Sequence, residues 1–261
     1  MGDREAAIGL AKKYLVDCIY SSVRVEGLNV TFPQTQEIIQ NAELAGVKAT
    51  DVLFVINMRD AWRFVLETLD EPVNSMYVRQ LNSICGHSLI YGCGVERSSD
   101  VYITGTTYKP PIPQHGDVVR SLQELREEKD PLRRAILTFA YLVKTQIFID
   151  GNKRVAQLTA NQILISSGVG VLRIPDTSVQ TFSECLIDYY ETGGNSLLNY
   201  LQEECLIRAQ VIETLQYRGM NFTVQEIISA LPESTRQAYR SDRECAEANI
   251  GLYYDILCRN S

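Results

Sequence analysis

A short polar loop between two apolar segments contains the residues best suited to chemistry: Asp150, Gly151 and Asn152, followed by Lys153 and Arg154. Gly permits a positive φ, and Asp or Asn can cap a helix, so the first three predict a turn that begins a helix. Two cations at the amino end of a helix oppose its dipole unless an anion lies beside them. Exposed N–H groups together with Lys and Arg side chains therefore predict a phosphate site. Asp150 would hold the Mg²⁺ that accompanies a nucleoside phosphate.

Helices on both sides must position this loop. Apolar residues recur with helical spacing in 131–145 before it and in 153–167 after it. The same periodicity predicts helices over 5–25, 50–70, 75–92, 117–128, 178–192, 195–215, 223–231 and 233–257, with a shorter one inside 32–50. Only 92–113 has a β pattern, because Val101, Tyr102 and Ile103 alternate ahead of two prolines, which favours a β-hairpin.

Composition narrows the classes of function. The chain has 261 residues, 45% hydrophobic and 22% charged, as expected for one large or two small globular domains. A net charge of −7 argues against a general nucleic-acid binder. No apolar run approaches the ~18 residues of a membrane span and no signal-peptide pattern is present, so we expect a cytoplasmic protein without a membrane partner. The seven cysteines include no CxxC pair and are expected to be reduced thiols.

The segment from Gln146 to Arg154 resembles the signature of the Fic (Fido) domain family, His-Pro-Phe-x-Asp/Glu-Gly-Asn-Gly/Lys-Arg. Six of its nine positions agree, namely Phe148, Asp150, Gly151, Asn152, Lys153 and Arg154. Gln146 stands where the family has its general-base histidine, and Ile147 where it has proline. Many members carry a second arginine three residues after the first, and Gln157 occupies that position here.

A second resemblance lies near the amino end. Ser22 and Glu26, followed by Gly27, are similar to the inhibitory motif Ser/Thr-x-x-x-Glu-Gly/Asn of one Fic class. The glutamate of that motif blocks productive placement of the γ-phosphate and usually pairs with the second arginine. Because Gln157 occupies the arginine position, we expect Glu26 to contact Lys153 or Arg154 instead.

The 92–113 segment resembles the Fic flap, which adds a backbone edge to an extended segment of the target protein. The residues that carry this resemblance are Val101, Ile103, Thr106 and Tyr108. A hairpin that only packs on the helices, with its tyrosine as an anchor, is the alternative.

Four further residues are considered for the site. In the family, residues near 178–192 line an adenine pocket, so Tyr189 and Tyr190 are candidates, with a core or rim role as the alternative. A histidine on a helix, such as His87, is more often a packed or surface residue than a catalyst, and substitution of the missing base by His87 or His115 is the alternative.

The resemblance implies an all-α fold, a Fic-type helical bundle with a short β-hairpin flap. We expect an N-terminal segment over 1–50 that holds the inhibitory helix, a core over 51–205 with the flap (92–113) and the signature loop (146–154), and a C-terminal helical appendage over 206–261. The appendage would cap the core, mediate dimerisation or form a small helix-turn-helix, and its mixed charge makes nucleic acid an unlikely partner. A homodimer is left open, as is inhibition within one chain or across a dimer.

The activity implied by the resemblance is protein adenylyltransfer, or AMPylation, in which AMP moves from ATP to a hydroxyl of a target protein or of the chain itself. Asp150 would hold Mg²⁺, Gly151 and Asn152 would form the anion hole, and Lys153 and Arg154 would clamp the distal phosphates. Gln146 has no basic lone pair near neutral pH. Because a general base contributes ~10²–10⁴-fold, transfer is expected to be slow.

Two other functions fit the same residues. One is a non-catalytic nucleotide-binding or interaction module that keeps the scaffold. The other is a phosphotransferase similar to the toxin Doc, a family member that also has lysine at the position of Lys153 but retains the histidine that Gln146 replaces here.

Overall fold

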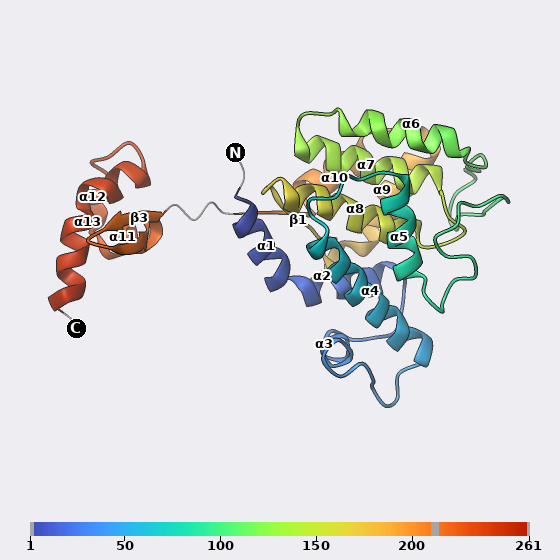
Figure 1. Cartoon of the computed structure of the whole chain (residues 1–261), viewed down its shortest axis with the longest axis horizontal. Helices are drawn as coiled ribbons and strands as arrows, with labels where there is room; N and C mark the ends of the chain where they lie inside the picture. Colours follow the sequence, from blue (N-terminus) through green and yellow to red (C-terminus); the bar gives the residue numbers. More distant parts are fainter. Residues whose placement is uncertain (1–2, 210–213, 260–261) are drawn as a thin grey trace. The chain divides into compact units, whose positions relative to one another are not determined.

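The structure, a computed structural model, describes residues 3–209 and 214–259. The chain divides into two compact units, Met1–Ala209 and Gln210–Ser261, which are described separately (Figure 1). Among the described residues, no helix is both long enough and apolar enough to cross a membrane.

The first unit is built from helices, which confirms the predicted fold class. The helices are α1 Arg4–Lys13, α2 Leu15–Val25, α3 Phe32–Asn41, α4 Ala49–Glu67, α5 Ser75–Cys85, α6 His115–Arg126, α7 Pro131–Thr145, α8 Asn152–Ser166, the short 3₁₀ turn η1 Asp176–Ser178, α9 Val179–Thr192 and α10 Ser196–Glu203. Strand β1 (Gly170–Leu172) pairs antiparallel with β2 (Leu206–Arg208), so that Val171 lies opposite Ile207.

Helix α8 is the centre of this unit, and Figure 1 shows it among the other helices. Every residue from Arg154 to Ile165 is buried, as expected for a helix enclosed on all sides. It contacts α7, α5, α4, α1 and β1. Two buried amides on α8 hold loops in place: Asn161 donates to the carbonyl of Leu172 and Gln162 to that of Leu69. The loop that begins α8 is therefore anchored to the best-packed element of the fold.

Several helices end earlier than their periodicity predicts. The helix expected over 5–25 breaks at Tyr14, and the one expected over 75–92 ends at Cys85. The helix predicted over 195–215 ends at Glu203, because Leu206–Arg208 is extended and pairs with β1. Long-range strand pairing overrides local helical periodicity there.

The flap prediction was wrong in its secondary structure, because no residue of 92–113 lies in a strand. The segment is an irregular loop with a turn at Thr104 and Gly105, where glycine adopts φ 88°. Pro110, Pro111 and Pro113 have no N–H to donate to a ladder. Most hydrogen bonds of the 92–113 backbone are therefore made with side chains.

The second unit combines a hairpin with helices. Strands β3 (Thr214–Tyr217) and β4 (Met220–Thr223) are joined by Arg218 and Gly219, whose φ angles of 48° and 81° suit a tight hairpin turn. Helices α11 (Val224–Ala230), α12 (Glu233–Arg236) and α13 (Asp242–Arg259) follow. Sequence reasoning missed the hairpin and predicted one helix over 233–257, where the structure has α12 and α13. Their shared core includes Phe222, Ile227 and Cys245.

Candidate functional site

The signature loop is held in shape by the side chain of Asn152. Its Oδ1 accepts a hydrogen bond from the backbone N–H of Phe148 at 3.0 Å, and its Nδ2 donates to the carbonyl of Phe148 at 2.8 Å. Nδ2 also donates to Oε1 of Gln146 at 2.9 Å. Phe148 is buried and anchors the loop in the core. The Asn152 amide, which was predicted to form part of the anion hole, thus makes its hydrogen bonds within the loop.

The turn that begins α8 depends on Gly151 and on a residue distant in sequence. Gly151 adopts φ 84° as the N-cap, and a Cβ there would lie 2.9 Å from Nδ2 of Asn82. The buried Asn82 donates to the carbonyl of Asp150 at 2.9 Å and accepts from the N–H of Gly94 at 2.8 Å. No pattern in the sequence marks Asn82 as a support of this loop, because a lone asparagine in a helix has many structural roles.

Charged side chains surround the start of α8. Nη2 of Arg154 lies 3.2 Å from Oδ2 of Asp150, and its Nη1 donates to the carbonyl of Cys85 at 3.2 Å. The guanidinium is only 5% exposed and lies 5.2 Å from the ring centre of Phe54. Arg154 therefore supports the loop from behind. Lys153, by contrast, lines the cavity.

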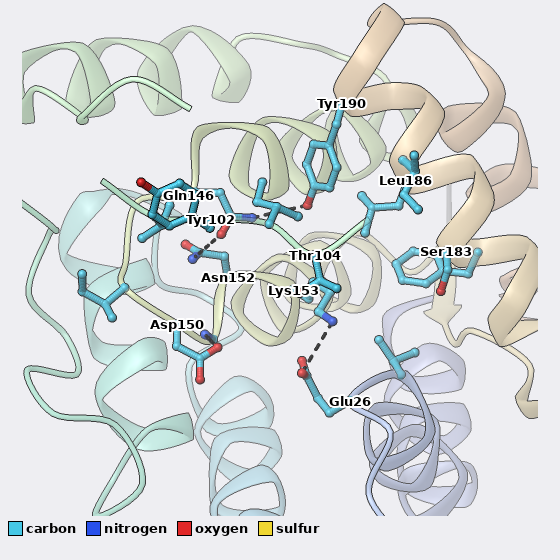
Figure 2. Close-up of a pocket in the computed structure, with 17 residues that line it drawn as sticks. Glu26, Tyr102, Thr104, Gln146, Asp150, Asn152, Lys153, Ser183, Leu186 and Tyr190 are labelled. Atoms are coloured by element: carbon cyan, nitrogen blue, oxygen red, sulfur yellow. Dashed lines mark hydrogen bonds and ion pairs between the residues drawn. The ribbon is translucent and has the colours of Figure 1, made fainter. Parts of the chain in front are cut away.

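Glu26 contacts both cations, as expected. Its carboxylate lies 3.5 Å from Nζ of Lys153 and 3.8 Å from Nε of Arg154. Glu26 is the C-cap of α2, so the end of that helix points its carboxylate at the α8 amino end. Figure 2 shows Glu26 approaching Lys153 from α2. One turn earlier, the hydroxyl of Ser22 donates to Oε1 of Gln157 at 3.1 Å.

Gln146 is fully hydrogen-bonded at the end of α7. It adopts φ 49° and ψ 62°, and its Nε2 donates to the carbonyl of Val143 at 2.7 Å and to the hydroxyl of Tyr190 at 3.3 Å. Oε1 accepts from Asn152, which gives the chain of contacts drawn in Figure 2. Burial raises the pKa of Tyr190, and the Gln146 hydrogen bond offsets this only in part. Neither Gln146 nor Tyr190 is a base at neutral pH.

A cavity of about 310 Å³ opens over the signature loop. Its polar side comes from Glu26, Gln146 and the four residues Asp150, Gly151, Asn152 and Lys153. Its apolar side comes from Val25, Ile149, the flap residues Val101 and Ile103, and the α9 residues Phe182, Leu186, Ile187 and Tyr190. Tyr102, Thr104 and Ser183 complete the lining. A polar, cation-bearing floor beside an apolar wall suits a ligand with a phosphate end and a ring end.

Tyr190 is the one member of the predicted tyrosine pair that reaches this cavity. The ring of Tyr189 lies under Nζ of Lys144 at 4.8 Å instead. Sequence reasoning missed Phe182 and Leu186 as lining residues, although their spacing of four places them on one helix face with Tyr190.

Of the four flap residues predicted to dock the target, two line the cavity and two contact α9 instead. Val101 and Ile103 line the cavity. Thr106 instead hydrogen-bonds to Glu191, and Tyr108 stacks on Tyr190 with ring centres 5.8 Å apart.

Neither histidine substitutes for the missing base. His87 follows α5, where its backbone carbonyl accepts from Asn57, and His115 begins α6, where Nδ1 lies 2.8 Å from Oε1 of Glu96. Neither one lines the cavity, which agrees with a packed or surface role for these histidines rather than with a base.

The residues present fit a magnesium ion that arrives with a nucleotide. Among the described residues, no group of three or more His, Cys, Asp or Glu side chains could hold a metal on its own. Asp150 offers one exposed carboxylate beside the cavity, with 59% of its side chain accessible. Mg²⁺ commonly uses one or two carboxylates and completes its shell with phosphates and water.

Comparison with known proteins shows similarity to one family. A family model described as Fic/DOC family matches residues 72–164. The chain is 26% identical over 188 residues to a protein named protein adenylyltransferase Fic from Nematostella vectensis, covering 66% of this chain and 41% of that protein. A protein of the same name from Drosophila grimshawi is 28% identical over 186 residues, covering 66% and 38%. The chain thus spans about two fifths of the length of these curated relatives.

Solved structures share the fold. Fic-1 from C. elegans, residues 134–508, superposes with a TM-score of 0.62 at 21% identity, covering 76% of this chain and 62% of that one. A Fic domain containing signaling protein from Bacteroides thetaiotaomicron gives 0.64 at 18% identity, covering 77% and 84%.

Proposed function

Because the chain carries a domain of the Fic/DOC family, we propose that it binds ATP with Mg²⁺ in the 310 Å³ cavity and transfers AMP slowly to a protein hydroxyl. The observation that carries this proposal is the amino end of α8, where Asp150, Gly151 and Lys153 face the cavity together. Backbone N–H groups at a helix start and an adjacent lysine bind phosphate oxygens through charge-assisted hydrogen bonds.

The ligand's two ends match the two sides of the cavity. The triphosphate would lie on the α8 amino end, near Lys153, and the adenine ring against Phe182, Leu186 and Tyr190. Mg²⁺ on Asp150 would neutralise phosphate charge. The apolar wall would bind the base by burial of surface, and the polar floor would fix its orientation.

In the proposed reaction, the oxygen of a serine, threonine or tyrosine hydroxyl of the target attacks the α-phosphorus. The bond from that phosphorus to pyrophosphate breaks, and the hydroxyl proton passes to solvent. Phosphoryl chemistry of this kind relies on positioning and charge neutralisation. Since Gln146 cannot accept the proton, the missing base would cost ~10²–10⁴-fold in rate.

Glu26 is proposed to inhibit the reaction. Its carboxylate lies 3.5 Å from Nζ of Lys153, the cation that lines the cavity and would otherwise contact the distal phosphates. The contact is made within one chain, which supports inhibition in cis. Binding of ATP in a productive orientation would require Glu26 to leave Lys153.

A second candidate, a non-catalytic nucleotide-binding module, is favoured by one contact. The Asn152 amide is hydrogen-bonded to Gln146 and to the carbonyl of Phe148, so it is not directed at a phosphate. In this alternative the chain binds ATP or ADP and turns neither over.

The decisive experiment uses the full chain with Glu26→Gly and Gln146→His combined. Incubation with α-labelled ATP and Mg²⁺ should label protein, either the chain itself or proteins of an added lysate, and Gln146→His should be the larger contributor. ATP binding by calorimetry without protein labelling would support the non-catalytic module. Label from γ-labelled ATP instead would indicate a phosphotransferase similar to Doc, and absence of nucleotide binding would refute all three.

A further inference from the structure

One buried guanidinium, that of Arg97, joins both ends of the flap to the signature loop. Only 3% of this residue is exposed. The guanidinium donates to five carbonyl oxygens, at distances of 2.6 to 3.4 Å: those of Gln146, Ser99, Pro110, Pro111 and Thr145. Its backbone N–H donates to the carbonyl of Ile147 at 2.9 Å. A single side chain thus connects the start of the flap, the end of the flap and the first residues of the signature loop.

The surroundings of Arg97 suit a cation without a carboxylate partner. Two of its acceptors, the carbonyls of Thr145 and Gln146, lie at the carboxyl end of α7, where the helix dipole favours positive charge. Burial lowers the pKa of Arg97, yet a guanidinium remains charged at neutral pH. Its planar fork of donors is what allows one residue to reach carbonyls on several segments.

The flap lacks a strand ladder that would set its position. The hydrogen bonds recorded for its backbone between Ser99 and Pro111 involve Arg97, Glu191 and the hydroxyl of Thr106. Glu191 holds the turn by accepting from the hydroxyls of Thr106 and Thr107. Side chains at the base and the turn therefore determine how the flap lies over the loop, and Val101 to Thr104 between them border the cavity.

We propose that Arg97 is a positioning residue for the protein target: it fixes the flap backbone at 101–104 relative to Asp150 and Lys153. This inference rests on the proposed function. Arg97 does not line the cavity. It acts through the flap, whose unpaired backbone groups at 101–104 are the edge on which an extended target segment would add. The consequence is that Arg97 controls transfer to a protein hydroxyl, whereas binding of ATP, whose proposed contacts come from α8 and α9, depends on Arg97 less.

Arg97→Lys separates positioning from charge. Lysine keeps the cation but has one compact ammonium, which cannot reach the five carbonyls that the fork contacts. In the full chain with Glu26→Gly and Gln146→His, Arg97→Lys should lower the ATP affinity by no more than about twofold in calorimetry, because the proposed contacts of ATP come from α8 and α9. Labelling of protein from α-labelled ATP should fall about tenfold or more, because a misplacement of ~1 Å can cost ~10²-fold in rate.

Arg79→Lys is the matched control. Nε of Arg79 donates to a single carbonyl, that of Gly94, at 3.0 Å. Gly94 belongs to the flap but precedes 97–111, the segment whose two ends Arg97 joins. It should change neither ATP affinity nor labelling. Glu191→Gln is a second test that leaves the core intact, because Glu191 is exposed and supports only the turn of the flap. It should also lower labelling at constant ATP affinity.

Proteolysis gives a readout that needs no nucleotide. Tyr102 is 85% exposed and lies within 97–111, the segment whose ends Arg97 joins. Tyr91 is fully exposed and precedes that segment. Arg97→Lys should speed chymotrypsin cleavage after Tyr102 and leave cleavage after Tyr91 unchanged.

The outcomes separate the two proposals. If the parent double variant binds no ATP, the proposed function fails and the positioning role fails with it. If it binds ATP and Arg97→Lys labels protein as well as the parent, or if ATP affinity and labelling fall together, the positioning role alone is overturned.

Discussion

The hydroxyl of Ser22 donates a hydrogen bond to Oε1 of Gln157 at 3.1 Å, and both residues are buried. The bond joins the end of α2 that carries Glu26 to the middle of α8, whose amino end carries Lys153. At the position of Gln157 the resemblance to Fic proteins implies an arginine that pairs with the glutamate. In this chain a hydrogen bond between two neutral side chains therefore connects the two helices. Glu26 instead contacts the cations at the start of α8.

Removal of the Ser22 hydroxyl should weaken the fold. Ser22→Ala leaves Oε1 of the buried Gln157 without its donor, which should cost ~1–3 kcal/mol of the free energy of unfolding. Ser22→Ala combined with Gln157→Leu removes both polar groups and should recover part of that loss. Urea unfolding of the two single variants and the double variant measures the coupling. Additive losses in the double variant would contradict a direct interaction.

Glu26 variants should bind nucleotide more tightly. The Glu26 carboxylate is only 20% exposed and pairs with Lys153, so Glu26→Gln frees a cation for phosphate. Since partly exposed ion pairs contribute about 1 kcal/mol or less, the dissociation constant for ATP should fall by up to about fivefold in calorimetry. Glu127→Gln is the control, because Glu127 is likewise a helix C-cap but belongs to α6 and does not line the cavity. Equal affinities for Glu26→Gln and the parent would remove the basis for inhibition by Glu26.

Features that depend on residues close together in the sequence were predicted correctly. The turn at Gly151 and the start of α8 follow from residue types within a few positions of one another. The contact of Glu26 with Lys153 and Arg154 was also predicted, because the absence of arginine at position 157 left those cations as the available partners.

Residues that act over long distances were missed. Asn82 holds the signature loop from α5, and Arg97 ties the flap to α7, but a single asparagine or arginine carries no periodicity that reveals its partners. The flap alternates like a strand, yet its ordering comes from side chains such as Glu191 rather than from a ladder. Tyr190 and Tyr189 are adjacent in sequence, and only the packing of α9 decides that Tyr190 faces the cavity.

Gly151→Ala should destabilise the protein and weaken nucleotide binding. Alanine at φ 84° costs ~1–2 kcal/mol, and its Cβ would lie 2.9 Å from Nδ2 of Asn82. The loop would shift at a position where Gly151 lines the cavity. Gly9→Ala is the control: Gly9 lies inside α1 with no atom within 4 Å of a new Cβ, so it should stabilise the fold by about 1 kcal/mol or less. If Gly151→Ala unfolds at the parent's urea midpoint, the glycine is not required by the backbone.

Stability should fall in alkaline solution because of buried thiols. Burial raises the pKa of Cys18 and that of Cys85 from 9.0 to about 12. The pKa of each thiol is higher in the folded chain than in the unfolded one. The stability that the neutral buried thiol contributes is therefore fully present below pH 9.0 and is lost as the pH rises toward 12. Across that window the free energy of unfolding should decline by up to about 1.4 kcal/mol per pH unit for each thiol. Cys85→Ala should make the decline shallower in urea titrations, whereas Cys258→Ala, at an exposed thiol, should not. An unchanged slope in Cys85→Ala would mean that this thiol ionises as readily in the folded chain as in the unfolded one.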